Sequence, residues 1–263
     1  MRKLILAASL VALFLPAIAV AKGNLDGTWK VDLKSVQFST KPDVFVLQHG
    51  MYDCKTCVPP ISVKADGMDH AVTGHPTYDT ISIKIVDDNT IEETDKKAGR
   101  TVSVGKTVVS ADGKIATVEF TDSGNPKGGP VTGKVILTRV AEGPAGSHAI
   151  SGSWRASKLG SFSDNALTIT FKTEGDSLHM TNLTGESYTA KLDGTEAPVT
   201  GDPGVTSVSV KRIGANTFEE TLKRNGKPTS VAHITVSADG KTLIVSSHNL
   251  LTDRTTKYTA VKL

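Results

Sequence analysis

Several patterns are scarce or missing in this sequence of 263 residues. In its second half, helical periodicity never lasts longer than a turn or two, which argues against a helical protein. Aromatic residues make up 5%, too few for the aromatic girdles of an outer-membrane barrel. The net charge of +3 falls to +1 without Arg2 and Lys3, so there is no basic surplus for binding nucleic acid. No segment after residue 21 is apolar enough to cross a bilayer as a helix.

Signatures of common enzyme classes are also missing. There is no Gly-x-Ser-x-Gly elbow, no His-Glu-x-x-His motif and no complete phosphate-binding loop. Charged residues are 22% and hydrophobic residues 38%, which is ordinary for a folded globular protein. The sequence therefore predicts a folded protein that is not an enzyme and has no cofactor, and it identifies no ligand.

Residues 1–21 are typical of a secretory signal peptide. A charged start, Met1 to Lys3, precedes an apolar run over 4–20, and Ala19-Val20-Ala21 matches a small-x-small cleavage site. An N-terminal membrane anchor is the alternative, but the run is short and is broken by Pro16. We expect export to the periplasm or the medium, with no membrane span in the mature chain.

An internal duplication is the strongest signal in the sequence. Residues 64–114 align without gaps with residues 191–241, and 24 of the 51 pairs are identical. The two copies also open alike, with Gly27-Thr28-Trp29 and Gly152-Ser153-Trp154. Identity at this level over so many positions indicates two homologous units in tandem.

The repeat length defines the expected domains. A period near 125 residues suits a whole domain and is too long for a solenoid repeat. We expect one domain at 22–140 and a second at 151–263. The stretch 141–150 between them is rich in small residues and is expected to be a linker.

Alternation with period two dominates each unit. In the first unit Ile81, Ile83 and Ile85 alternate with polar residues, which predicts a strand with one solvated face. Asp-Gly and Asn-Gly dipeptides between such segments favour tight hairpins. In the second unit we expect strands near 152–157, 167–173, 178–183, 187–192, 206–213, 217–223, 230–237, 242–248 and 255–262.

A meander of eight or nine short strands must remove its edges by closing into a barrel or by forming two packed sheets. Closure is the simpler solution for sequential hairpins. Lys, Ser and Thr on the alternate face exclude the apolar outer band of a membrane barrel. The predicted fold is all-β, with two tandem antiparallel meander β-barrels.

Gly-x-Trp at the start of the first strand resembles the opening motif of lipocalin-like (calycin) barrels. The chain is also similar to secreted bacterial proteins of unknown function with tandem lipocalin-like domains, through Asp-Gly-x-x-x-Pro-Val-Thr-Gly-x-Pro at 193–203; the first unit lacks the first of these prolines. The resemblance implies that Trp29 and Trp154 each close one end of a barrel. It also implies that a basic residue of a last strand, Arg139 or Lys262, covers each indole.

The two cysteines, Cys54 and Cys57, are followed by His70 and His75 at the spacing of a two-Cys two-His zinc site. A zinc finger needs a helix leading into its histidines, but the intervening residues include Pro59-Pro60 and an Asp-Gly turn. For an exported protein, a disulfide between the two cysteines is expected. A metal site and a redox dithiol are the alternatives.

Glu93 and Glu220 occupy equivalent positions in the two units. Counting by two from Ile91 and Phe218 places each glutamate on the same face as an apolar residue. A carboxylate inside a barrel is costly unless it is paired or meets a ligand. Either the strand bulges, or the glutamate lies near an open rim, or it is a polar anchor for a ligand inside the barrel.

Together these patterns predict an exported, non-enzymatic protein that carries or sequesters a small apolar ligand in one or both barrels. One alternative is a structural or protein-interaction module of the cell envelope whose barrels are filled by their own side chains. The others are a metal-binding protein that uses the two cysteines and two histidines, and an enzyme that uses one of the two glutamates as acid or base. The oligomeric state is not predicted.

Overall fold

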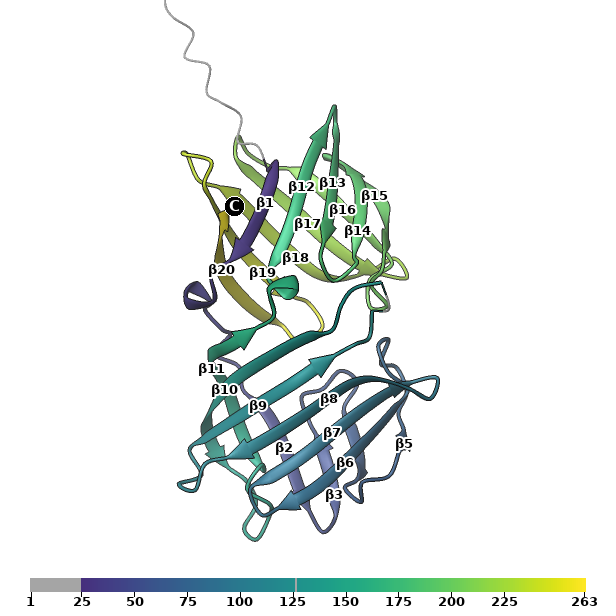
Figure 1. Ribbon diagram of the computed structural model, residues 1–263, viewed down its shortest axis with the longest axis vertical. Helices are drawn as coiled ribbons and strands as arrows, with labels where there is room; N and C mark the ends of the chain where they lie inside the picture. The colour runs from purple at the N-terminus through teal and green to yellow at the C-terminus, as the bar shows by residue number, and fades with distance from the viewer. Residues whose placement is uncertain (1–24, 126) are drawn as a thin grey trace, which may run out of the picture.

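The protein is all-β and consists of two barrel-shaped antiparallel sheets, seen one above the other in a computed structural model (Figure 1). The structure describes residues 25–125 and 127–263. Within these residues the helical elements are two short 3-10 turns, η1 (Leu33–Ser35) and η2 (Asp164–Ala166). The predicted signal peptide, residues 1–21, lies outside the described residues.

The first barrel is a sheet of ten strands in the order β4-β3-β2-β11-β10-β9-β8-β7-β6-β5. All neighbours are consecutive in the chain except β2 and β11. The end strands β4 and β5 do not pair with each other, so this barrel is nearly closed. Its strands are β2 (Asp43–Gln48), β3 (Met51–Cys54), β4 (Ile61–Lys64), β5 (His70–Ala71), β6 (Thr80–Asp87), β7 (Thr90–Lys97), β8 (Arg100–Val109), β9 (Ile115–Asp122), β10 (Val131–Glu142) and β11 (Gly152–Phe162).

The second barrel is closed and also has ten strands, β1 followed by β12 to β20 in chain order. Closure pairs both flanks of every strand and so leaves no sheet edge. Its strands are β1 (Gly27–Val31), β12 (Thr168–Glu174), β13 (Ser177–Asn182), β14 (Ser187–Lys191), β15 (Asp193–Thr200), β16 (Ser207–Arg212), β17 (Thr217–Arg224), β18 (Lys227–Val236), β19 (Thr242–Asn249) and β20 (Arg254–Lys262).

The two repeats exchange their opening strands. β1, from the first repeat, pairs with β12 and β20, and places Trp29 opposite Lys262. β11, from the second repeat, pairs with β10 and β2, and places Trp154 opposite Arg139. Each barrel therefore takes its Gly-x-Trp strand from the other repeat, and Figure 1 shows the purple β1 beside β12 and β20.

Because of this exchange, the sequence repeats and the two sheets do not coincide. The boundaries 22–140 and 151–263 follow the duplication, whereas the sheets consist of β2–β11 and of β1 with β12–β20. Residues 141–150, expected as a linker, complete β10 and form the turn into β11 within the first barrel. The chain passes between the barrels twice, at 32–42 and at 163–167.

Each sheet has ten strands, more than the eight or nine expected per unit. The nine segments expected in the second repeat correspond to β11–β14 and β16–β20, so the sequence missed β15. This strand contains Pro198 and a register shift between Asp193 and Glu196, which together hide its alternation. Asp193-Gly194, expected as a hairpin turn, begins β15 directly after the turn residue Leu192.

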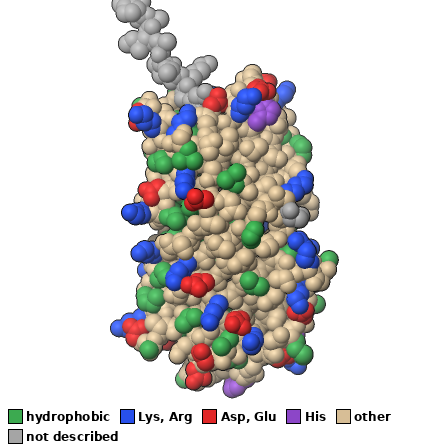
Figure 2. All heavy atoms as spheres, in the orientation of Figure 1, with side chains coloured by type: hydrophobic (Ala, Val, Ile, Leu, Met, Phe, Trp, Pro, Cys, Tyr) green, Lys and Arg blue, Asp and Glu red, His purple; other side chains and the backbone are tan. Residues whose placement is uncertain are grey.

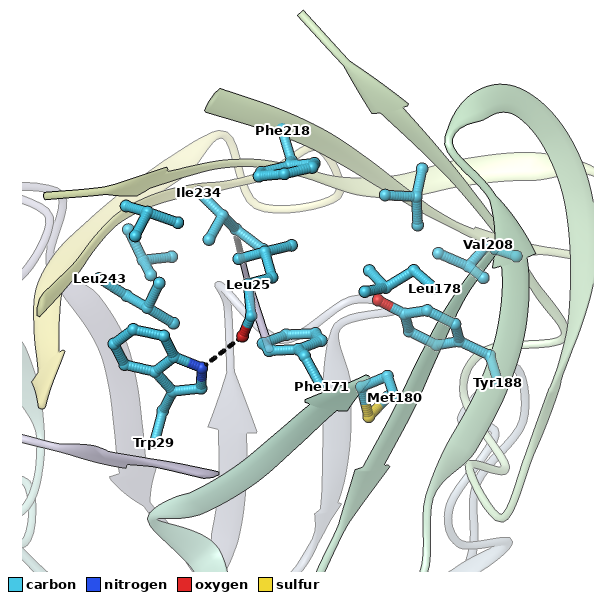
Figure 3. Close-up of a cluster of buried hydrophobic side chains, with 14 of the residues drawn as sticks. Leu25, Trp29, Phe171, Leu178, Met180, Tyr188, Val208, Phe218, Ile234 and Leu243 are labelled. Carbon is cyan, nitrogen blue, oxygen red and sulfur yellow. Dashed lines mark hydrogen bonds between the residues drawn. The ribbon is translucent and has the colours of Figure 1, made fainter. Parts of the chain in front are cut away.

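Apolar side chains at alternate strand positions line the interior of both barrels and pack into one buried cluster in each. In the first barrel, the buried cluster includes Tyr52, Ile81, Ile83 and Trp154. Figure 3 shows the cluster of the second barrel, in which Trp29, Phe171, Leu178 and Phe218 converge from four strands. Burial of this apolar surface is the main driving force for folding.

The outer surface carries charges of both signs. On the face in Figure 2, Lys and Arg side chains are interspersed with Asp and Glu, and hydrophobic side chains are scattered. This mixture agrees with the small net charge of the sequence and forms no basic patch on that face. In the part of the chain that the structure describes, no helix has the length and hydropathy needed to cross a membrane.

Candidate functional site

A basic side chain covers a tryptophan in each barrel. The guanidinium carbon of Arg139 lies 4.1 Å from the centroid of the Trp154 ring, and Nζ of Lys262 lies 5.2 Å from that of Trp29. Both indoles are fully buried, and each Nε1 donates to the carbonyl four residues earlier, at 2.8 Å for Trp29 and 2.7 Å for Trp154. A cation over an indole face is favourable. In each barrel the tryptophan and the basic residue that covers it come from different repeats, because the opening strands are exchanged.

The glycine of each Gly-x-Trp motif is a steric requirement of this arrangement. Gly27 and Gly152 both have a φ of 131°, which disfavours any other residue. A Cβ on Gly152 would lie 2.5 Å from the carbonyl oxygen of Ala141, and one on Gly27 would lie 2.4 Å from Cε of Lys262. Glycine, tryptophan and the basic residue therefore form one packing unit in each barrel.

A largely enclosed cavity of about 220 Å³ lies inside the second barrel. Its walls come from β1, β12 and β17 to β20, and most of the side chains are apolar. Protein cavities of roughly 150 Å³ with such walls stay dry and hold benzene. The lumen therefore has room for a small ring system. The lining residues are Val31, Ile169, Phe171, Glu220, Leu222, Ser230, Ala232, Ile234, Leu243, Val245, Ser247, Tyr258 and Ala260.

Glu220 is the carboxylate on the wall of this cavity. The hydroxyl of Tyr188, from β14 across the lumen, donates a 2.5 Å hydrogen bond to Oε2 of Glu220, and Figure 3 shows this hydroxyl pointing into the barrel. Burial raises the pKa of Glu220, and the Tyr188 hydrogen bond partly opposes this. Burial and the nearby Glu220 raise the pKa of Tyr258 to about 12. The polar spot in the lumen is therefore a carboxyl group among phenols.

The strand around Glu220 is regular. β17 pairs residue by residue with β16 and β18 through this position, and its register shift comes later, between Leu222 and Lys223. Glu220 therefore faces inward as part of the normal alternation. Of the three readings of this glutamate, the regular register contradicts the strand bulge, and it does not distinguish between the open rim and the ligand anchor.

Glu93 has the equivalent position in the first barrel, but its surroundings differ. Asp95, two residues later on the same face, stands where the second barrel has Leu222. Burial raises the pKa of Glu93 to about 8, and the charge of Asp95 adds to this effect. Burial and Asp122 raise the pKa of Asp95 to about 6. The first barrel thus has two inward carboxyl groups where the second has one beside an apolar cavity.

Cys54 and Cys57 form a disulfide at the end of β3, as expected from the sequence. Both sulfurs are used, so a zinc site would lack its two thiolates. His70 Nε2 lies 2.8 Å from an aspartate oxygen, and the His75 ring stacks on the Tyr78 ring with centroids 4.7 Å apart. Within the described residues, no group of three or more His, Cys, Asp or Glu side chains is placed to hold a metal ion.

Three polar residues of the barrel interiors were not predicted from the sequence: Tyr188, Tyr258 and Asp95. Asp95 could have been found by the same counting that placed Glu93 on the inner face. Tyr188 lies in a predicted strand, but no local pattern indicates that its hydroxyl meets Glu220 from β14, three strands away.

Comparison with known proteins gives no match, either to a protein-family model or to a curated protein. The function is therefore inferred from the geometry of the two barrels.

Proposed function

We propose that the protein is an exported, non-enzymatic binding protein of lipocalin-like type that holds a small apolar molecule in its second barrel. The observation that carries this proposal is the cavity of about 220 Å³ with mainly apolar walls inside a closed barrel. Closed barrels of this kind hold single small ligands, and apolar cavities with few polar groups are typical binding sites.

The polar groups of the lumen favour a ligand that carries one hydrogen-bonding group. Glu220 has a raised pKa, so it retains a proton more readily than a solvated carboxyl and can donate to a ligand oxygen. Ser230 and Ser247 also line the cavity, with their hydroxyl oxygens 3.5 Å apart. A phenol or an alcohol on a ring of one or two cycles fits this combination of volume and polarity.

Export is supported by two independent observations. Residues 1–21 have the pattern of a signal peptide. The Cys54–Cys57 disulfide suits an oxidising compartment such as the periplasm or the medium. Both observations support the proposal that binding occurs in the cell envelope or outside the cell.

Fluorescence titration with 2-naphthol, whose emission depends on its environment, tests the proposal. The informative variant is Ala232→Leu, because Ala232 lines the cavity and a leucine there would fill part of it. The control is Val231→Leu, because the neighbouring residue on β18 points to the opposite face. Melting curves of both variants show that the barrels remain folded.

We expect saturable binding to the wild type and to Val231→Leu, and at least tenfold weaker binding to Ala232→Leu. Equal binding to all three would place the probe outside the lumen and overturn the proposal. The smaller cyclohexanol, followed by calorimetry, is a second probe. If neither 2-naphthol nor cyclohexanol binds the wild type, the result would instead favour the interaction module with side-chain-filled barrels.

A further inference from the structure

A second cavity lies where the two barrels meet. This cleft has a volume of about 280 Å³, and its walls come from β7, β8 and β9 of the first barrel and from loops of the second. Those loops are the turns at 184–186 and 201–203. Nδ2 of Asn125, after β9, donates a 2.6 Å hydrogen bond to the carbonyl of Gly201, which fixes the two sides relative to each other.

Four carboxyl groups line this cleft. Asp95 and Asp122 come from the first barrel, and Glu186 and Asp202 come from the second. Among the described residues that line it, none is Lys, Arg or His. The negative charge of the cleft therefore has no cation on its walls.

Asp95 is the carboxyl group that indicates a missing partner. The residue is 9% exposed, and its buried Oδ1 has no hydrogen-bond donor. The other three carboxyls all accept hydrogen bonds: Asp122 from a backbone N–H at 2.7 Å, Asp202 from one at 2.6 Å, and Glu186 from an asparagine amide at 2.7 Å. A buried acceptor without a donor is rare and costly, and Asp95 is one of the residues that line the cleft.

Two basic residues, Arg100 and Lys127, lie next to the cleft but are not among the residues that line it. Burial and the neighbouring Asp122 raise the pKa of Asp95 to about 6, and burial with Asp202 and Asp122 raises the pKa of Glu186. The guanidinium of Arg100 donates to the backbone carbonyls of residues 123 and 124. His75 stacks behind Tyr78, and burial lowers its pKa, which keeps it neutral at neutral pH.

The shape of the site distinguishes between kinds of cation. A bare metal ion needs several oxygen ligands within about 2.6 Å, but no three carboxyls of the described chain are close enough together to hold one. The carboxyls instead stand on both sides of a cleft that also contains Tyr78 and Val102. Methylene groups can pack on such apolar walls, and an ammonium group is attracted to an aromatic face.

We propose that the cleft between the barrels binds an aliphatic diamine. One ammonium group donates to the buried Oδ1 of Asp95, and the other faces Glu186 and Asp202 on the second barrel. The methylene chain between them lies along the apolar side chains of the cleft. This site shares no lining residue with the lumen of the second barrel.

Isothermal titration with 1,4-diaminobutane at low ionic strength tests the proposal, with magnesium chloride and 1-butanol as comparison ligands. Asp95→Asn removes the charge at nearly constant size, and Glu186→Gln does the same on the other barrel. Glu174→Gln is the matched control, because Glu174 is an exposed carboxylate paired with Lys172 and does not line the cleft. If one of the two cleft variants does not fold, the other still tests whether the cleft carboxyls bind the diamine.

We expect the diamine to bind the wild type and Glu174→Gln with equal affinity. Asp95→Asn and Glu186→Gln should each weaken binding at least tenfold, and 1-butanol should not bind. Equal binding to all variants, displacement of the diamine by equimolar magnesium, or no binding to the wild type would each overturn the proposal.

Discussion

Substitution of Trp29 by phenylalanine tests the strand exchange. Trp29 lies on β1, close to the N-terminus of the described chain, yet its ring packs in the cluster of the second barrel with Phe171 and Phe218 (Figure 3). Trp29→Phe removes the 2.8 Å indole hydrogen bond to Leu25 and part of the attraction to Lys262. A lost buried hydrogen bond costs about 1 kcal/mol and a lost cation–π contact about 0.5 to 1 kcal/mol.

With the smaller ring volume included, we expect a loss of about 2 kcal/mol from the second barrel. Such a loss makes amide hydrogen exchange about thirtyfold faster where exchange requires that barrel to open. The change should appear in β12 to β20, while β3 to β9 of the first barrel change much less. Trp154→Phe is the matched control and should give the reverse pattern, because Trp154 packs in the first barrel.

Hydrogen exchange followed by mass spectrometry resolves the two barrels. Faster exchange in the first barrel for Trp29→Phe, and in the second for Trp154→Phe, would show that each repeat keeps its own opening strand. That result would refute the exchanged topology. Uniformly faster exchange in both barrels would mean that they unfold as one unit, and would refute the assignment of each tryptophan to a single barrel.

Three further predictions concern the first barrel. Replacing Cys54 and Cys57 by serine removes a short cross-link worth roughly 2 kcal/mol, so calorimetry should show its melting temperature reduced by a few degrees and that of the second barrel unchanged; equal shifts in both would contradict this. The pKa of Glu93 is raised to about 8 in the folded protein. The unfolded chain therefore loses this proton at lower pH than the folded chain, and the free energy of unfolding should fall as pH rises from about 4.5 to about 8. In Glu93→Gln, melting measured against pH should lose most of this slope, and an unchanged slope would assign it to other groups. Gly152→Ala forces a side chain into positive φ and against a backbone carbonyl, so denaturant titration should show a loss of at least about 1 kcal/mol, and a neutral result would contradict the steric role of the motif.

Local signals in the sequence predict much of the fold. The alternation of Ile81, Ile83 and Ile85 identifies β6, and the same periodicity finds nine of the strands of the second half. β15 was missed because a proline and a bulge interrupt its alternation. The disulfide was predicted from the number of cysteines and the expected compartment, and it is present.

The exchange of β1 and β11 could not be predicted from local pattern. The two Gly-x-Trp segments are so similar that either one satisfies the same site, with the same φ of 131° at Gly27 and Gly152. Which barrel each segment joins depends on the crossovers at 32–42 and 163–167, and no periodicity encodes that choice. The sequence therefore indicates Trp29, Trp154 and their basic partners, but not which repeat supplies the tryptophan of each barrel.

Period two raised the possibility of inward-facing glutamates, whereas it gave no sign of their partners. Period two places Glu93 and Glu220 inside the barrels, because the inner face of a strand is set within the strand itself. The hydroxyl of Tyr188 reaches Glu220 from β14, so this contact depends on closure of the whole sheet. Cavity volume is likewise a property of the packed barrel, and the sequence does not reveal it.

A crystal structure of the protein with 6-bromo-2-naphthol tests the central claim most directly, because anomalous scattering locates the bromine without reference to the protein atoms. We predict one strong peak inside the second barrel, among Phe171, Ala232 and Leu243, with the ligand hydroxyl within hydrogen-bond distance of Glu220. A peak only on the outer surface, or an empty lumen at saturating ligand, would contradict the account.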